Sequence, residues 1–236
     1  MKAWVIYKRE LKALAVAPIT YVLGAIFLLA AGYRFSLMLI QTSRVEFYPI
    51  QFRYMTNVLL IFTPLLTMRL LAGERESGSI ALLFTSPIDE WAVVLGKWGA
   101  TYTVVSLYLL LTMPLAAILF SVGEPDKGPI IAGYLGLYLL SGTFCAIGLF
   151  ASSLTTSSIV SAVIGFGINL FFGVVERLKD MSAASLGAFF EGLSYIPACR
   201  DFFGGVIYGK HVIFFLSLTF FFLFATQRML CSNRWR

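Results

Sequence analysis

Residues 128–175 contain no charged side chain, and this run constrains the fold of the whole chain. A helix crosses a bilayer with about 20 consecutive apolar residues, so the run is too long for one crossing and suits two. Six Ser and Thr residues between positions 152 and 158 mark the turn between them. Charged residues make up 13% of the chain, against about 25% in soluble domains, which excludes a soluble globular fold.

Further uncharged, apolar stretches are long enough for one span each: residues 13–33, 54–68, 98–123 and 212–227. We therefore predict an all-α integral membrane protein with six transmembrane helices, forming a single transmembrane domain over residues 1–236. The first stretch is longer than the apolar core of a typical signal peptide, and no clear small-residue cleavage site follows it. We therefore expect that it is not a cleaved signal peptide.

Six spans place both termini on one side of the membrane. The N-terminal tail is rich in Lys and Arg, and such tails stay in the cytoplasm. We predict that both termini are cytoplasmic. The net charge of +6 is thus a topology signal, and no nucleic-acid partner is expected.

Residues 1–12 are amphipathic. Apolar side chains recur at helical spacing at Trp4, Tyr7 and Leu11. The basic residues occupy or border the other face: Lys2, Lys8, Arg9 and Lys12. We predict a helix lying in the inner headgroup layer; a plain basic tail that only sets topology is the alternative.

The inner loop after the second span is dense in helix signals. Residues 86–89 read Ser-Pro-Ile-Asp, a capping box that predicts a helix starting at Ser86 and running into the third span. Ser79, after Gly78, is placed to cap a shorter helix that ends at Thr85. The apolar side chains of this short helix are Ile80, Leu82, Leu83 and Phe84. They fit either packing back onto the membrane or docking into a groove of another protein.

The segment 176–210, on the opposite side, is too apolar for an exposed loop. We predict two short re-entrant helices that dip into the outer leaflet before the sixth span, with breaks at Pro197 and at Gly204-Gly205. The alternative is a small extracellular helical cap.

Together these features resemble the transmembrane subunit of an ABC transporter of the ABC-2 (type 2 exporter) family. The family loop reads roughly E-R-E-x-G-T-x-E-x-L-x-x-S-P, and residues 74–87 here read ERESGSIALLFTSP. Ser79 replaces the usual Thr, and Ala81 replaces the usual Glu, so one polar contact of the family is missing.

The last quarter of the chain is similar to permeases of the gliding-motility and nitrous-oxide-reductase-maturation systems. The similarity lies in RDFFGGVIY at residues 200–208 and VIFFLSL at residues 212–218. Tyr208, Lys210 and His211 stand where that subgroup usually has acidic residues.

The resemblance implies a permease that works as a dimer with two ATPase subunits, in the bacterial plasma membrane. The second permease is another copy or a paralogue, and an extracytoplasmic accessory subunit is a further implied partner. Residues 74–87 would be the coupling helix that seats on the ATPase, through Glu74, Arg75, Glu76, Gly78, Ser79, Leu82, Leu83, Phe84, Thr85 and Pro87. The family places spans 1 and 5 at the dimer seam, where span 5 offers Ser161, Ala162, Gly165, Gly167 and Asn169.

The expected function is therefore export of a hydrophobic, lipid-linked or polymeric substrate. No P-loop is present: Gly96-Lys97 has Trp91 where the first Gly belongs and Trp98 after the Lys. We therefore expect ATP and Mg²⁺ to bind to a separate subunit. We expect this chain to bind no cofactor and to catalyse no reaction. A mechanotransmission or structural subunit is the alternative, and an intramembrane enzyme that uses His211 is a remote one.

Overall fold

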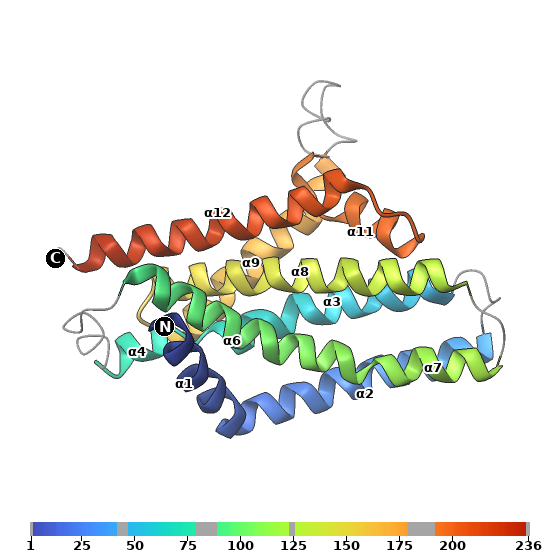
Figure 1. Ribbon diagram of the computed structural model, residues 1–236, viewed down its shortest axis with the longest axis horizontal. Helices are drawn as coiled ribbons and strands as arrows, with labels where there is room; N and C mark the ends of the chain where they lie inside the picture. Colours follow the sequence, from blue (N-terminus) through green and yellow to red (C-terminus); the bar gives the residue numbers. More distant parts are fainter. Residues whose placement is uncertain (1, 42–46, 79–88, 123–125, 179–191, 235–236) are drawn as a thin grey trace.

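The computed structural model describes residues 2–41, 47–78, 89–122, 126–178 and 192–234, and all its regular elements are helices. In chain order these are α1 Lys2–Val16, α2 Pro18–Gln41, α3 Phe47–Thr67, α4 Ala72–Glu76, α6 Glu90–Leu111, α7 Met113–Val122, α8 Lys127–Leu154, α9 Ser158–Val174, the 3₁₀ turn η1 Val175–Leu178, α11 Ile196–Phe203 and α12 Gly209–Arg234. Figure 1 shows the long helices lying side by side, with both termini at the same end of the bundle.

The expected all-helical membrane fold is confirmed at the level of its long helices. Five stretches of the described residues are long and apolar enough to cross a bilayer: Pro18–Leu39, Pro49–Glu76, Glu90–Phe120, Lys127–Leu154 and Gly209–Ser232. The predicted fifth span corresponds to α9, which is apolar but shorter. Six crossings remain a prediction.

Large apolar side chains cover the outside of these helices. Leu29 on α2, Ile159 on α9 and Ile213 on α12 are 72%, 75% and 68% exposed. An exposed apolar surface of this kind is stable against lipid and unstable in water. The exterior of the bundle therefore agrees with a bilayer environment.

The centre of the bundle is α8, which contacts α3, α6, α9, α11 and α12. Its glycines let neighbours approach its backbone. A Cβ on Gly136 would lie 2.8 Å from the Phe202 side chain, and a Cβ on Gly133 would run into the Phe52 ring. At the other end of the helix, a Cβ on Gly148 would run into the Thr67 hydroxyl.

Two predicted helix starts are wrong in position. The N-terminal helix continues past residue 12 to Val16, and the first span begins at Pro18 instead of residue 13. Pro has no N–H to donate, so it fits the first turn of a new helix. The helix expected from Ser86 begins at Glu90, because Asp89 is extended and its carboxylate accepts a hydrogen bond from the Trp91 amide.

The third span is broken where the sequence predicted one helix. It divides into α6 and α7 at Thr112. Pro114 has no N–H for the helical hydrogen bond and its ring crowds the preceding turn, which explains the break. At the break, the Thr112 hydroxyl and the Thr112 amide both donate to the Leu109 carbonyl, at 2.7 and 3.1 Å.

In the segment before α12, helix α11 packs on α8, with buried Phe202 against Gly136. Pro197 lies in its first turn, so it starts the helix and does not break it. The predicted break at Gly204-Gly205 is confirmed, with Gly205 at φ +89°. The first of the two predicted re-entrant helices lies in residues 179–191, outside the described residues, and insertion of either into the leaflet remains a prediction.

The close contact of α8 with α3 gives a first test. Gly148→Ala would force a methyl group into the Thr67 hydroxyl, which is fixed by a hydrogen bond to the Thr63 carbonyl at 2.9 Å. We expect a loss of about 1–3 kcal/mol in unfolding free energy, read as a lower thermal unfolding midpoint of the purified protein in detergent. Gly32→Ala is the matched control, because open space surrounds Gly32 on α2. Equal midpoints for the two variants would contradict this packing.

Candidate coupling site at the end bearing the termini

The break between α3 and α4 is stabilised by a side chain from another helix. The first amides of a helix have no intrahelical acceptor. The Leu71 and Ala72 amides at the start of α4 donate to the Ser152 Oγ of α8 at 3.0 and 2.9 Å. The same hydroxyl donates to the Met68 carbonyl at 3.1 Å, so Ser152 uses its donor and both acceptor sites. It therefore fixes the point where the chain leaves the bundle for the inner loop.

A buried lysine joins the three helices that surround this point. Lys97 on α6 has a side chain that is only 1% exposed. Its Nζ lies 3.2 Å from Oε1 of Glu10 on α1 and 2.9 Å from Oε1 of Glu74 on α4. Because a buried ammonium is unstable without a counter-charge, Lys97 holds both carboxylates, and thus both helices, against α6.

Arg9 closes this ion cluster from the outside. Its Nη2 lies 2.7 Å from Glu10 Oε1 and 3.1 Å from Glu74 Oε1. The hydrogen bond that Arg9 donates to Glu10 has the largest effect on the pKa of Arg9, and with the Glu10 and Glu74 carboxylate charges it raises this pKa against the opposing effect of burial. Two cations and two carboxylates thus alternate, and the cluster of Arg9, Glu10, Glu74 and Lys97 is neutral overall.

The other end of α4 is bonded to α9. The Ser158 hydroxyl, at the first residue of α9, donates to Glu76 Oε2 at 2.9 Å. Ser158 follows the turn that ends α8, so the bond reaches the fifth predicted span at its start. The short helix α4 is consequently tied to α1, α6, α8 and α9 by named polar contacts.

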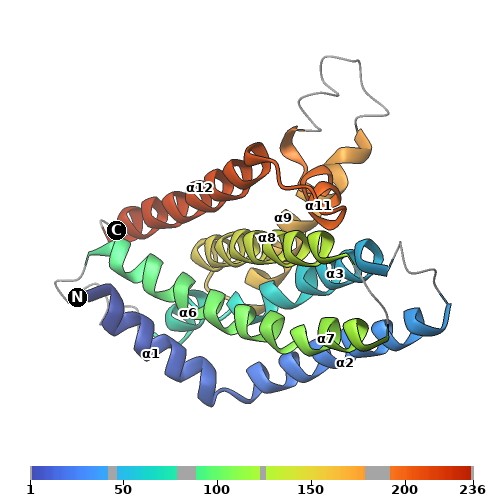
Figure 2. The ribbon, with the colours of Figure 1, turned by 45° about the vertical axis from the view of Figure 1, so that its right-hand side comes forward.

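Helix α1 lies along α6, as Figure 2 shows. A Cβ on Gly96 would lie 2.8 Å from Ile6 Cγ2, so glycine is needed for the contact. Two turns further along α6, the Tyr7 and Thr103 hydroxyls are 3.0 Å apart. The side of α1 that contacts the bundle therefore carries Ile6 and Glu10.

The predicted lipid-facing residues of α1 are placed as follows. Trp4 is 59% exposed, while Tyr7 and Leu11 are half-buried. Lys8, Arg9 and Lys12 are exposed, and Lys8 Nζ lies 5.2 Å from the centre of the Trp4 ring. Trp4, Lys8 and Lys12 are thus exposed, while Arg9 also reaches the ion cluster, and the position of α1 relative to the headgroups remains a prediction.

Of the predicted coupling residues, the structure describes only the first part. Glu74 points into the ion cluster, Arg75 is half-buried, Glu76 bonds to Ser158, and Gly78 adopts φ +72°. The remainder lie outside the described residues: Ser79, Leu82, Leu83, Phe84, Thr85 and Pro87. Two of the three charged side chains expected to contact the ATPase, Glu74 and Glu76, therefore make contacts within the chain.

The residues predicted for a dimer seam fall on two sides of α9. Ser161, Gly165 and Asn169 are buried, and the Gly165 Cβ position lies 3.4 Å from Pro64 of α3 and 3.5 Å from Ala151 of α8. Ala162 is half-buried and Gly167 is exposed with open space around it, away from that contact.

Sequence reasoning missed Glu10, Ser152 and the role of Lys97. The available signal was Lys97 itself, a cation followed by an apolar helix and flanked by Trp91 and Trp98, which requires a partner. Glu10 was the one acidic residue among the basic residues of the first twelve. No local sequence pattern linked Glu10 to Lys97, because their contact depends on how α1 lies on α6.

The fold and this site define a multi-pass helical membrane protein whose inner loop is tied to several of its helices. The family model described as ABC-2 family transporter protein matches residues 4–178. The match spans well over half of the chain, so the chain belongs to the ABC-2 family of transporters, as a membrane component. No curated protein matches the chain. The subgroup suggested by residues 200–218 lies beyond the matched residues and remains a prediction.

The ion cluster gives the second test. Lys97→Met would leave the Glu10 and Glu74 carboxylates with Arg9 as their remaining cation, and removing one partner of a buried pair costs about 3–5 kcal/mol. We expect a large fall in the thermal unfolding midpoint. Lys12→Met, on the exposed side of α1, should change little. The double variant Lys97→Met/Glu10→Gln should recover part of the loss, and equal behaviour of Lys97→Met and Lys12→Met would show that the cluster does not hold the helices together.

Proposed function

We propose that the chain is the permease half of an ABC exporter, which dimerises with a second copy or a paralogue and is driven by separate ATP-binding subunits. Residues 74–87 act as its coupling segment, on the cytoplasmic side with both termini. The observation that carries the proposal is the attachment of α4 to four helices through Ser152, Ser158 and the ion cluster. A displacement of the inner loop is transmitted through these bonds to α1, α6, α8 and α9 at once.

The absence of a P-loop from the sequence assigns ATP hydrolysis to the partner. Lys97 supports this assignment, because its ammonium group is buried and paired with the carboxylates of Glu10 and Glu74. The substrate class of the proposed exporter is hydrophobic, lipid-linked or polymeric, as the family resemblance implies.

The apolar anchors Leu82, Leu83 and Phe84 are proposed to seat in a cleft of the ATPase. Buried apolar and aromatic anchors contribute roughly 2 kcal/mol or more each at hot spots of such interfaces. Exposed ion pairs contribute about 0–1 kcal/mol. Glu74 and Glu76 already bind Lys97 and Ser158 of this chain, which further favours the apolar side chains over the charged ones as the main contacts with the ATPase. Apolar contact thus dominates docking of the ATPase.

Leu83→Asp tests this docking. We expect normal amounts of the permease in the membrane but loss of the ATPase that co-purifies with the wild-type protein from its native host in mild detergent. Ser77→Asp, which adds the same charge at an exposed position of the segment ahead of the apolar anchors, should retain the ATPase. Undiminished ATPase binding by Leu83→Asp would overturn the assignment, and a fall in membrane abundance would indicate packing of Leu83 onto the permease itself.

The dimer seam is proposed to use the outward face of α9. Ser161, Gly165 and Asn169 are already occupied by contacts within the chain, whereas Val163 is 66% exposed and Gly167 leaves room for a close neighbour. Small residues allow such approach between membrane helices.

Cross-linking distinguishes the two faces of α9. On a background without Cys145, Cys199 and Cys231, Val163→Cys and Gly167→Cys should form disulfide-linked dimers in native membranes, because the two α9 helices meet there. Ser161→Cys, buried against α3 and α8, should not cross-link. Dimers obtained only from Leu107→Cys, exposed on α6, would place the seam elsewhere.

A further inference from the structure

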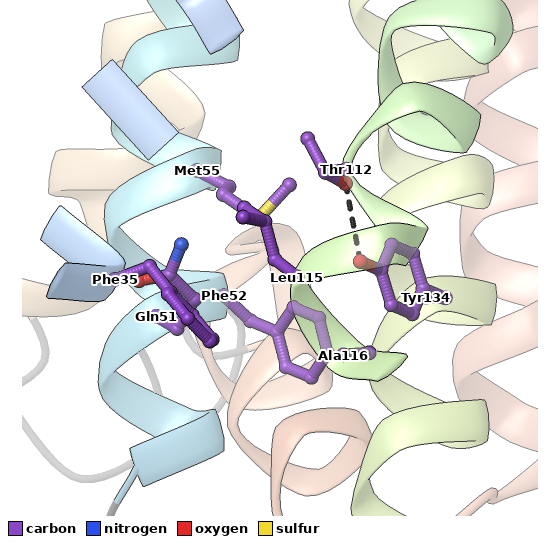
Figure 3. Close-up of a pocket in the computed structure, with 8 residues that line it drawn as sticks. All are labelled: Phe35, Gln51, Phe52, Met55, Thr112, Leu115, Ala116 and Tyr134. Atoms are coloured by element: carbon purple, nitrogen blue, oxygen red, sulfur yellow. Dashed lines mark hydrogen bonds between the residues drawn. The ribbon is translucent and has the colours of Figure 1, made fainter. Parts of the chain in front are cut away.

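A cavity of about 370 Å³ lies between α3, α9 and α11, in the half of the molecule away from the two termini (Figure 1). Its volume is in the range of small-molecule sites in proteins. The cavity in Figure 3, enclosed by α2, α3, α7 and α8 around Gln51 and Tyr134, has only about 20 Å³. It holds no more than a molecule of the size of water. Of these two cavities, only the first accommodates a ligand of substantial size.

The walls of the larger cavity are fixed by close packing. The ring of Tyr195, which lines the cavity, rests on Gly173 of α9, where a Cβ would lie 2.6 Å from the Tyr195 hydroxyl oxygen. Behind this wall, α11 is held by buried Phe202 and by the contact of Asp201 Oδ2 with His211 Nε2 at 2.7 Å. The space is therefore set by the helices and does not depend on one mobile side chain.

The lining includes both aliphatic and cationic side chains. Leu60 of α3 and Leu170 of α9 contribute aliphatic surface, while Arg53 of α3 and Arg200 of α11 contribute guanidinium groups. Arg200 is paired with Glu176 at 3.1 Å. Arg53 has no ion-pair partner among the residues that the structure describes. Among the described residues, one positive charge is thus in excess beside the apolar lining.

We propose that this cavity binds a membrane amphiphile with an anionic headgroup. Arg53 and Arg200 hold the headgroup, because a guanidinium binds phosphate or carboxylate oxygens with paired hydrogen bonds. The adjoining aliphatic surface of Leu60 and Leu170 receives the upper part of the hydrocarbon chain. The inference goes beyond the proposed function, since it requires a bilayer but neither an ATPase nor transport.

The test measures lipid bound to the purified full-length protein. The protein in a neutral detergent is titrated with phosphatidylglycerol or with phosphatidylcholine of the same chains, and bound lipid is counted by native mass spectrometry. We expect tighter binding of phosphatidylglycerol, and at least a tenfold loss of its affinity in Arg53→Gln/Arg200→Gln. The control Lys127→Gln/Lys210→Gln removes the same charge from two exposed residues that do not line the cavity, and should bind as the wild type does.

A second pair of variants tests the apolar side. Ile50→Trp fills part of the cavity and should weaken phosphatidylglycerol binding, whereas Ile61→Trp, on the exposed side of the same helix, should not. Glycerol phosphate at the same concentration should fail to displace the lipid, because it lacks the chain.

Three results would overturn the proposal. These are equal affinity for the two lipids, an arginine variant that binds phosphatidylglycerol as the lysine control does, and full displacement by glycerol phosphate. All are measured without an ATPase, so they leave the coupling assignment to its own test.

Discussion

The need to neutralise one buried ammonium group determines how this end of the bundle is built. Lys97 has nearly no contact with the exterior, so its charge is stable only with carboxylates beside it. Glu10 arrives on the N-terminal helix and Glu74 at the exit of the second long span. The position of α1 along α6 and the direction in which the chain enters the inner loop therefore follow from the same requirement. Arg9 balances the second carboxylate and leaves the cluster neutral.

The rest of the bundle is arranged around α8, the most buried of the five long apolar stretches. Glycines along α8 admit α3 at Gly133 and Gly148 and α11 at Gly136, while Ser152 of the same helix fixes the α3–α4 break. One helix thus positions the outer segment at one end and the inner loop at the other. The cavity beside Arg53 and the coupling residues lie on different parts of this frame, on α3, α9 and α11 and on α4 and its neighbours.

Much of this architecture is predictable from the sequence, because uncharged runs of sufficient length have few alternatives to membrane helices. The turn within residues 152–158 and the break at Gly204-Gly205 follow from local chemistry. The face of α1 that packs on the bundle does not follow from local chemistry. Lipid and the protein interior are both apolar, so the spacing of apolar residues cannot show which of the two a face contacts. Ile6 contacts the bundle while Trp4 points away, whereas the helical spacing in the sequence grouped Trp4 with Tyr7 and Leu11 on one apolar face. The pairing of Glu10 with Lys97 depends on that same choice of face.

The ion cluster also sets an order of events during synthesis of the protein. Glu10 leaves the ribosome many residues before Lys97, and chains grow at roughly 5–20 residues per second. For several seconds α1 therefore has no buried cation to receive its carboxylate, and its exposed cations and Trp4 are left to the membrane surface. Helix α1 reaches its final position only when α6 has been inserted. The N-terminal helix is thus among the first elements to be made, but its buried counter-charge arrives only with α6.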